Sequence, residues 1–227
     1  MASRFPSLKT DLNGGRHAIA ALSCVLLLAA ASLPALAQQS GTSPAPPAAP
    51  QVVVLVNLRS ADVTITDIKF RAFYNKIEKK VIPLTGYDMK AAIQDEVMLA
   101  LAEDTRAQWR LATAEDGLDG MALADDKQRT PAMLASLKGD RVLLLDVYGV
   151  GGALQSLVKN MYIGVSVQML DRDGRRLWKK GVNPRMKFPG SIEEAQADNQ
   201  KGFKQAVNTL IERFCEDLKS KLGEQQI

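Results

Sequence analysis

The chain has 227 residues, 46% of them hydrophobic and 24% charged, and this length and composition indicate a globular protein with a sizeable core. The formal net charge is only +4, and the chain contains one histidine, His17, and two cysteines. Because His17 lies in a segment that we expect to be removed, the mature chain has neither a Ser-His-Asp triad nor a histidine-based metal site.

The N-terminal segment has the pattern of a secretory signal peptide. Residues 1–17 carry three basic residues against one acid, residues 18–33 are uncharged and rich in Ala and Leu, and Ala35 and Ala37 are the small residues that a signal peptidase reads. We therefore predict a signal peptide over 1–37, cleaved between Ala37 and Gln38. The alternative is an uncleaved anchor, but the apolar run is shorter than the roughly 20 residues of a spanning helix. No transmembrane span is expected after cleavage.

Composition divides the mature chain into a tether and a domain. After removal of residues 1–37, 26 Lys and Arg stand against 24 Asp and Glu, so the net charge of +2 gives no reason to expect nucleic-acid binding. Residues 38–50 (QQSGTSPAPPAAP) form a Pro/Ala-rich tether, predicted to be disordered. Residues 51–227 are predicted to be one domain. Its single cysteine, Cys215, lies on the flank of an apolar helix stripe and is interpreted as a half-buried hydrophobe.

The first predicted elements are a strand, an irregular strand and a helix. The apolar run at 51–58 (QVVVLVNL) is typical of a strand covered on both faces. Alternation over 63–73 slips at Thr66 and Asp67, which suggests a turn or a bulge. A helix is predicted over 88–103, with Asp88 as its N-cap.

A short strand at 108–112 and a helix-and-loop segment at 113–138 come next, before a second buried strand at 141–148. The late part of the chain then predicts a β-hairpin and a closing helix. Residues 161–170 alternate cleanly, 171–174 (DRDG) form the turn, and 175–182 return.

Ser191 and Glu194 have the spacing of a capping box that opens the final helical region, which Gly202 is expected to kink or divide. Buried strands that alternate with amphipathic helices, followed by a hairpin, predict an α/β fold with α+β character. Its mixed β-sheet carries amphipathic helices on its surface and ends in a C-terminal helix.

Several segments carry a family resemblance in their layout: QVVVLVNL, LALAEDTRAQWRLATAED, RVLLLDVYGVGG, YIGVSVQMLDRDGRRLWKKG and the closing amphipathic helix. Over residues 51–222 this layout resembles the periplasmic α/β domain of the curli-secretion lipoprotein and of penicillin-binding-protein activator lipoproteins. The resemblance implies a mixed α/β domain with a role in the envelope. The chain departs from the family in two ways: Leu22 stands one place too late for a lipobox at Cys24, and residues 150–161 are too short for a pore hairpin.

The hairpin carries a basic patch that is the strongest candidate for a binding site. Two acids oppose it, and its members are Arg172, Arg175, Arg176, Trp178, Lys179, Lys180 and Arg185. Such a patch can hold anionic headgroups, an anionic polymer or an acidic protein face. The structural alternative is a Lys-protected edge strand. Leu177 and Trp178 cannot both face the core of a regular strand, so one of them is expected to be exposed.

Three other candidates have stronger structural interpretations. Residues 149–152 (GVGG) lack the third glycine of a dinucleotide motif and the G-K-[ST] of a P-loop, so a flexible link is favoured. Asp146 interrupts a buried strand and must be paired or lie in a cleft. The acids Asp125 and Asp126, with three more at 115–119, lack calcium-loop spacing, so a solvated loop is favoured over a cation site.

We therefore expect no catalytic residues, no metal and no cofactor. The predicted function is that of a non-catalytic accessory or binding protein of the bacterial envelope, exported to the periplasm or the periplasm-facing side of the outer membrane. It would use the hairpin and the irregular region 59–84 to engage another envelope protein or an anionic envelope polymer or lipid headgroup. Two alternatives are a carboxylate-dependent enzyme acting on glycans, which needs two opposed acids in a cleft, and a small-ligand-binding periplasmic protein.

Overall fold

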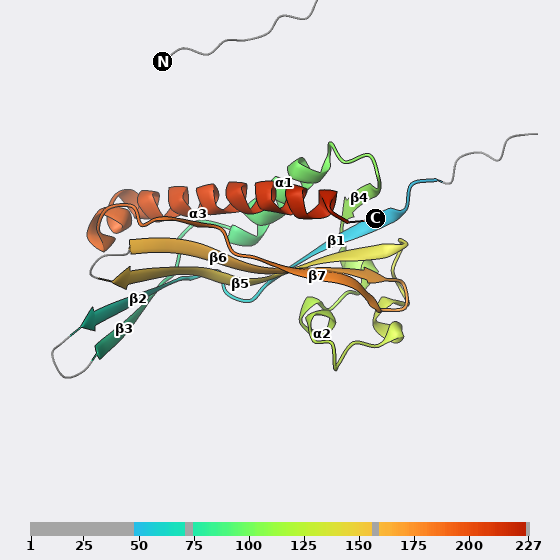
Figure 1. Ribbon diagram of the computed structural model, residues 1–227, viewed down its shortest axis with the longest axis horizontal. Coiled ribbons are helices and arrows are strands. Elements are labelled where there is room, and N and C mark those ends of the chain that lie inside the picture. The colour runs from blue at the N-terminus through green and yellow to red at the C-terminus, as the bar shows by residue number, and fades with distance from the viewer. Residues whose placement is uncertain (1–47, 71–74, 156–158, 226–227) are drawn as a thin grey trace, which may run out of the picture. The chain divides into compact units, whose positions relative to one another are not determined.

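The computed structural model describes residues 48–70, 75–155 and 159–225 (Figure 1). The predicted signal peptide, its cleavage site at Ala35, Ala37 and Gln38, and most of the tether lie outside these residues. The described helices are α1 (Met89–Leu101), α2 (Gly120–Ala124) and α3 (Ile192–Gly223), with 3-10 turns at Ala114–Asp116 and Pro131–Leu134. None of these helices is long and apolar enough to cross a membrane.

A mixed sheet is built around two long antiparallel strands, β5 (Arg141–Gln155) and β6 (Lys159–Asp171). Two strands follow one another along the other edge of β5 and run parallel to it. β1 (Gln51–Leu58) pairs with its first half, and β2 (Val63–Phe70) pairs with its second half. Long central strands therefore hold two shorter strands in one line.

Four shorter strands complete the sheet. β4 (Gln108–Leu111) lies parallel beside β1, and β3 (Asn75–Ile82) lies antiparallel beside β2. At the opposite side, β7 (Arg176–Val182) and β8 (Arg185–Lys187) share the outer edge of β6. The described strands thus form one eight-stranded mixed sheet, and the predicted α/β fold with a late hairpin and a C-terminal helix is confirmed.

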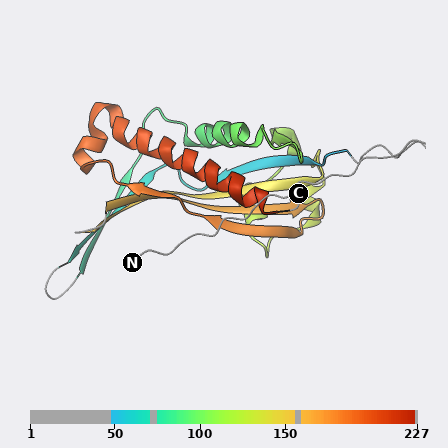
Figure 2. The same cartoon turned by 45° about the horizontal axis from the view of Figure 1, so that its top comes forward.

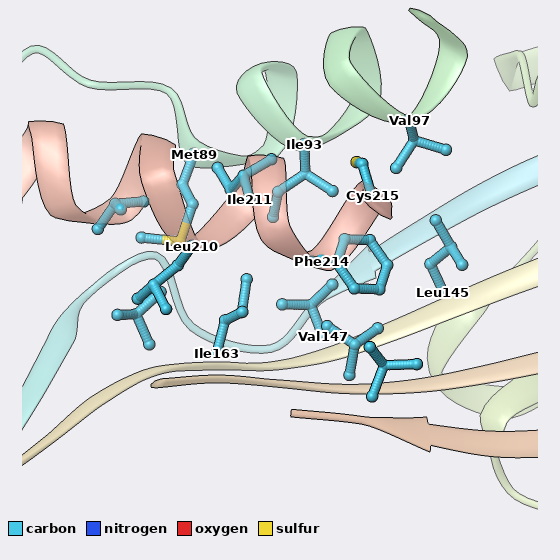
Figure 3. Packing of buried hydrophobic residues seen from close by; sticks show 14 of the residues in the cluster. Met89, Ile93, Val97, Leu145, Val147, Ile163, Leu210, Ile211, Phe214 and Cys215 are labelled. Carbon is cyan, nitrogen blue, oxygen red and sulfur yellow. The ribbon is translucent and has the colours of Figure 1, made fainter. Parts of the chain in front are cut away.

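Helices α1 and α3 cover one face of the sheet, which we call the helix face (Figures 1 and 2). Figure 3 shows the main core between these layers, where Ile93 of α1 and Phe214 of α3 lie above Val147 and Ile163 of the sheet. The residues that β1, β5 and β6 contribute to this core occupy alternate positions, as the period of two in a strand requires. The main core therefore lies on one side of the sheet only.

The opposite face, which we call the α2 face, carries a smaller core. Val53, Val142, Leu144 and Leu170 of the sheet pack there against Leu123, Leu134 and Leu137. All three of the covering side chains come from the segment 114–139, which contains α2. That segment lies against β1 and β5 close to where these strands begin (Figure 1). The rest of the α2 face has no described helix above it.

Two local expectations are wrong and one strand was not expected, in each case because tertiary pairing overrides a local pattern. β2 pairs in unbroken register with β3 and β5, so Thr66 and Asp67 form no bulge. β3 itself was not predicted, because its charged sequence NKIEKKVI resembles a loop until it is paired with β2. The GVGG segment is part of β5 and pairs with β2 and β6 instead of forming a flexible link.

The final helix is divided, but not at Gly202. Residues 197–200 leave the helical conformation, with positive φ at Asp198, Asn199 and Gln200. The side chain of Gln200 bridges to the loop before α1, since it donates to the carbonyl of Pro83 at 2.7 Å and accepts from the backbone of Thr85 at 2.9 Å. Gly202 instead allows close packing, because a Cβ there would lie 2.9 Å from Cα of Ala195.

Candidate functional site

The α2 face changes from apolar to polar along its strands. Beneath α2 lie the leucines and valines of the smaller core. We call a row of residues paired across neighbouring strands a rung. The next rung along the strands holds Asn57, Asp146 and Ser166 in direct register on β1, β5 and β6. Gly120, at the start of α2, packs on Asn57, so α2 ends its cover of the sheet at this rung. An exposed polar surface begins where this cover stops.

Asp146 is the buried polar centre of that boundary, with 1% of its surface exposed. One carboxylate oxygen accepts from Asn57 Nδ2 at 2.7 Å and from Arg59 Nε at 2.9 Å, and the other accepts from Arg59 Nη2 at 2.6 Å. This hydrogen bonding raises the pKa of Arg59 above its usual value. The expectation that Asp146 is paired is confirmed. Its role is to fix the Arg59 guanidinium in place.

A bulge in β5 places Tyr148 beside Arg59. Val147 pairs with Val165 and Gly149 with Gly164, so Tyr148 is the extra residue, and Gly149 has φ of 128°. The Arg59 guanidinium lies 4.7 Å from the centre of the Tyr148 ring, within cation–π range. Tyr148 is half exposed. Bulges that redirect a side chain are common next to functional sites.

Beyond Tyr148 the sheet surface is hollowed. An open groove of about 330 Å³, which we call the tyrosine groove, is lined by Ser60, Asp62, Thr64, Tyr148, Gly149, Val150, Gly151, Tyr162, Gly164 and Asn183. A Cβ on Gly151 would lie 2.3 Å from Cζ of Tyr162, so the Tyr162 phenol lies across the β5 backbone. Glycine at this position is required for that arrangement.

The surface around the groove is a continuous area of sheet, which we call the open face. One rung crosses it from β3 to β8 through Val81, Thr64, Gly151, Tyr162 and Arg185. The next rung holds Lys79, Thr66, Ala153, Asn160 and Lys187. With these two rungs, Arg59, Ile77 and Tyr148 complete the open face.

Exposed apolar side chains gather on the open face. Seven large hydrophobic residues are exposed in the described part of the chain, and four of them, Ile77, Val81, Tyr148 and Tyr162, lie here. Arg185, Lys187 and Lys79 stand at the two ends of the rungs and are also exposed. An exposed apolar area with a charged rim is typical of an interaction surface.

A second hollow, of about 590 Å³, lies on the other side of Arg59, between α2 and Lys179. Its three acids are all engaged: Asp119 caps α2, Asp125 accepts from the backbone of Lys127, and Asp126 forms ion pairs with Arg129 and Arg176. These partners leave the acids fixed within the fold. Among the described residues, no three His, Cys, Asp or Glu side chains are grouped as metal ligands.

Asp116 corrects the interpretation of the acidic segment as a solvated loop. It is 1% exposed and accepts two hydrogen bonds from Arg110, at 2.7 and 2.8 Å. The backbone N–H of Thr113 donates to it as well, at 2.9 Å. Asp116 therefore anchors the segment that carries α2.

The structure separates the seven residues of the predicted basic patch. Arg172 and Arg175 lie exposed in the turn, where Gly174 has the expected positive φ of 78°. Trp178 is half-buried against the main core, and Lys180 pairs with Val167, so both belong to the helix face. The patch is thus not one continuous surface.

The other three residues of the patch lie on the α2 face. Arg176 is held by Asp126, Lys179 borders the second hollow, and Arg185 stands on the open face in register with Tyr162. Leu177 is the extra residue of a bulge in β7 and is 47% exposed, so the expectation that one of Leu177 and Trp178 is exposed is confirmed.

The sequence pattern pointed to Arg59 only as part of the broad region 59–84, and it did not indicate that Tyr148, Tyr162 and Asn183 lie with it on one surface. The sequence of β6 did contain part of the information. Its alternating pattern buries Ile163 and Val165 on one face of the strand and therefore places Tyr162 on the other face. Their convergence could not be predicted, because it depends on how four strands pair and on a bulge.

No family model matches the sequence, and no curated protein is significantly similar to it. Among solved structures, the hypothetical protein CT253 from Chlamydia trachomatis matches with a TM-score of 0.50 at 12% identity, over 76% of this chain and 95% of that one. This similarity concerns the fold alone.

Two further structures match with lower TM-scores. The lipoprotein GNA1162 from Neisseria meningitidis has a TM-score of 0.37 at 16% identity, over 71% of this chain and 98% of that one. PelC from Paraburkholderia phytofirmans, a dodecamer, has a TM-score of 0.33 at 13% identity, over 74% of this chain and 86% of that one.

Proposed function

We propose that this protein is a non-catalytic, exported binding protein of the bacterial envelope. It engages an acidic envelope component through the open face. The observation that carries the proposal is the exposed, uncovered part of the sheet, where four large apolar side chains lie among the cations Lys79, Arg185 and Lys187.

The apolar side chains of the open face have no described helix above them. Elsewhere in this fold most apolar side chains of the sheet are buried under α1, α3 or the segment 114–139, and the exception is Leu177 in the bulge of β7. On the open face Ile77 and Val81 are more than half exposed. Burial of apolar surface by a partner contributes about 25 cal/mol per Å², and the surrounding Lys and Arg favour a partner of opposite charge.

The side-chain arrangement favours binding over glycan hydrolysis. Hydrolysis requires two opposed carboxyl groups, one of them positioned to donate a proton. Among the residues that line the tyrosine groove, Asp62 is the only acid. Asp146 is nearby, but hydrogen bonds from Asn57 and Arg59 occupy both of its oxygens.

Export is the part of the proposal that rests on sequence alone. The basic start, the apolar stretch and the Ala35-Leu36-Ala37 end support secretion, and the Pro/Ala-rich segment 38–50 supports a spacer between the domain and its site of release. We place the protein in the periplasm or on the periplasm-facing side of the outer membrane.

A pull-down from envelope extract tests the binding surface. The mature protein is compared with three charge-reversed variants: Arg185→Glu with Lys187→Glu on the open face, Arg172→Glu with Arg175→Glu in the turn, and Lys90→Glu with Lys201→Glu as a control on α1 and α3. We expect the first variant alone to lose its partners. Equal recovery of partners by all four proteins would contradict the proposal. Loss of partners in the turn variant alone would show that the binding site lies at the tip of the hairpin.

A further inference from the structure

We infer that the tyrosine groove holds a segment of an acidic glycan, a chain of sugar rings that carry carboxylates. This inference rests on the proposed function and names the chemical class of the ligand. The floor of the groove, its aromatic wall, its polar groups and the cations beside it support this class of ligand.

The floor of the groove suits a flat ring. Gly149 and Gly164, which are paired on β5 and β6, leave the sheet surface low beside the Tyr162 ring, which itself covers Gly151. The volume of about 330 Å³ lies within the range of small-ligand sites, and the groove is open to solvent. An open, shallow groove accepts one part of a long chain, whereas an enclosed cavity would accept only a small molecule.

The aromatic wall comes from Tyr162, which lies across the Gly151 backbone and is 40% exposed. The face of an aromatic ring is electronegative, so it attracts the polarised C–H groups on the apolar face of a pyranose. Tyr148 flanks the opposite side, although Arg59 is stacked on its ring. The Tyr162 ring is therefore the surface on which a sugar ring packs.

The polar groups of the groove match sugar hydroxyls. Each hydroxyl both donates and accepts hydrogen bonds, and Ser60, Thr64, Asn183 and Asp62 together offer hydroxyl, amide and carboxylate partners. Asn183 is exposed, and its Oδ1 lies close to Gly164 on the groove floor. These short side chains fix an orientation without filling the groove.

The charges favour an acidic glycan over a neutral one. The one charged residue that lines the groove is Asp62, and the cations lie just outside it: Arg59 beside Tyr148, and Arg185 in register with Tyr162. Lys187 and Lys79 lie one rung farther on. Arg59 is already paired with Asp146, so Arg185 is the neighbouring cation that we expect to meet a sugar carboxylate.

A polypeptide fits this place less well. An extended peptide binds a sheet mainly by adding a strand at its edge. The groove lies on the face of β2, β5 and β6, whose backbone groups pair with one another across this region. A ligand here must therefore be recognised through ring packing and side-chain hydrogen bonds.

The test uses the mature protein, beginning at Gln38, and oligogalacturonate as the probe, with binding measured by calorimetry. We expect oligogalacturonate to bind at least about tenfold more tightly than neutral dextran or poly-L-glutamate. Tyr162→Ala should weaken binding about tenfold or more, whereas Tyr162→Phe, which keeps the ring, should weaken it less than about threefold.

Tyr162→Ala uncovers the sheet at Gly151 and could therefore also destabilise the fold. A second variant tests the groove without this effect. Asn183→Asp alters an exposed residue, adds a negative charge to the groove, and should weaken oligogalacturonate binding about tenfold. Lys201→Glu on α3 is the matched control and should bind as the wild type does.

The outcomes separate this inference from the proposed function. Equal affinity for poly-L-glutamate, or binding that is indifferent to both groove variants, would overturn the glycan assignment and leave an acidic protein as the ligand of the open face. Absence of oligogalacturonate binding, with envelope partners still recovered through Arg185 and Lys187, would likewise overturn only the glycan assignment. Equal recovery of envelope partners by the wild type and by the variant with Arg185→Glu and Lys187→Glu would overturn both the glycan assignment and the proposed function.

Discussion

At the scale of single residues, two buried carboxylates each hold one arginine in place. Asp116 and Asp146 are each about 1% exposed, and an arginine pairs with both oxygens of each. Asp146 fixes a residue of the open face, whereas Asp116 fixes the segment that carries α2. The same chemistry thus serves a binding surface in one case and the fold in the other.

Asp116 leads to a prediction about acid stability. The hydrogen bonds from Arg110, followed by those from the backbone of Thr113 and Lys138, hold the pKa of Asp116 well below its usual range. A lowered folded-state pKa adds stability above the unfolded-state pKa of about 4, and this stability is lost as pH falls toward the folded-state pKa. Asp116→Asn should lower the free energy of unfolding at pH 7 by about 3 kcal/mol.

The variant should also lose less stability than the wild type between about pH 5 and pH 2. Urea unfolding at a series of pH values measures both effects. Glu103→Gln, at an exposed residue, is the control and should leave the pH profile unchanged. A profile of Asp116→Asn parallel to that of the wild type would contradict the assigned pairing.

Cys215 leads to a second prediction at this scale. The side chain is buried in the main core between α1 and α3 (Figure 3), and burial raises its pKa to about 12. Only the thiolate is reactive, so the native protein beginning at Gln38 should react with Ellman's reagent more than about a hundredfold more slowly than the unfolded protein. Similar rates would mean that α3 opens readily from the sheet.

At the scale of elements, local chemistry and tertiary pairing contribute differently. The capping box of Ser191 and Glu194 is present as predicted, with both hydrogen bonds formed, and Asp88 caps α1. These signals are local, so they can be read from a few neighbouring residues. β3 and the second half of β5 could not be recognised in this way, because their strand character comes from pairing with β2 and not from their own sequence pattern.

The capping box gives the prediction for the last helix. Ser191→Ala removes the hydroxyl that accepts from the Glu194 N–H, which should cost about 1 kcal/mol of stability. For a domain of this size that corresponds to a fall in Tm of about 2–4 °C. Ser191→Asp, which retains a capping acceptor, should melt close to the wild type in a thermal scan. An unchanged Tm in Ser191→Ala would show that the first turn of α3 adds little to stability.

At the scale of the whole molecule, the two faces of the sheet are covered to different extents. Two helices bury most of the first face, while α2 and its flanking turns bury only part of the second. This asymmetry creates the open face and defines the place where the proposed ligand docks. It also explains why the basic patch of the hairpin is not one site, since alternate residues of β7 point to opposite faces.

The predicted route to the envelope is tested on the whole chain. When the full sequence is expressed in a Gram-negative bacterium, the protein in the periplasmic extract should begin at Gln38, as determined by N-terminal sequencing. Changing Ala35 and Ala37 together to Arg should block processing, because the peptidase needs small residues there. An unprocessed chain recovered in the membrane fraction would establish the uncleaved anchor instead.

The sequence by itself determined the strand and helix content of most of the domain, the mixed sheet, the caps and the hairpin turn. These follow from periodicity and from side-chain chemistry within a few residues. Only the tertiary structure decided that β1 and β2 share one edge of β5, that a bulge raises Tyr148 beside Arg59, and that Tyr162 crosses Gly151. The open face is made by side chains that strand pairing brings together from five strands, so no local pattern along the chain could reveal it.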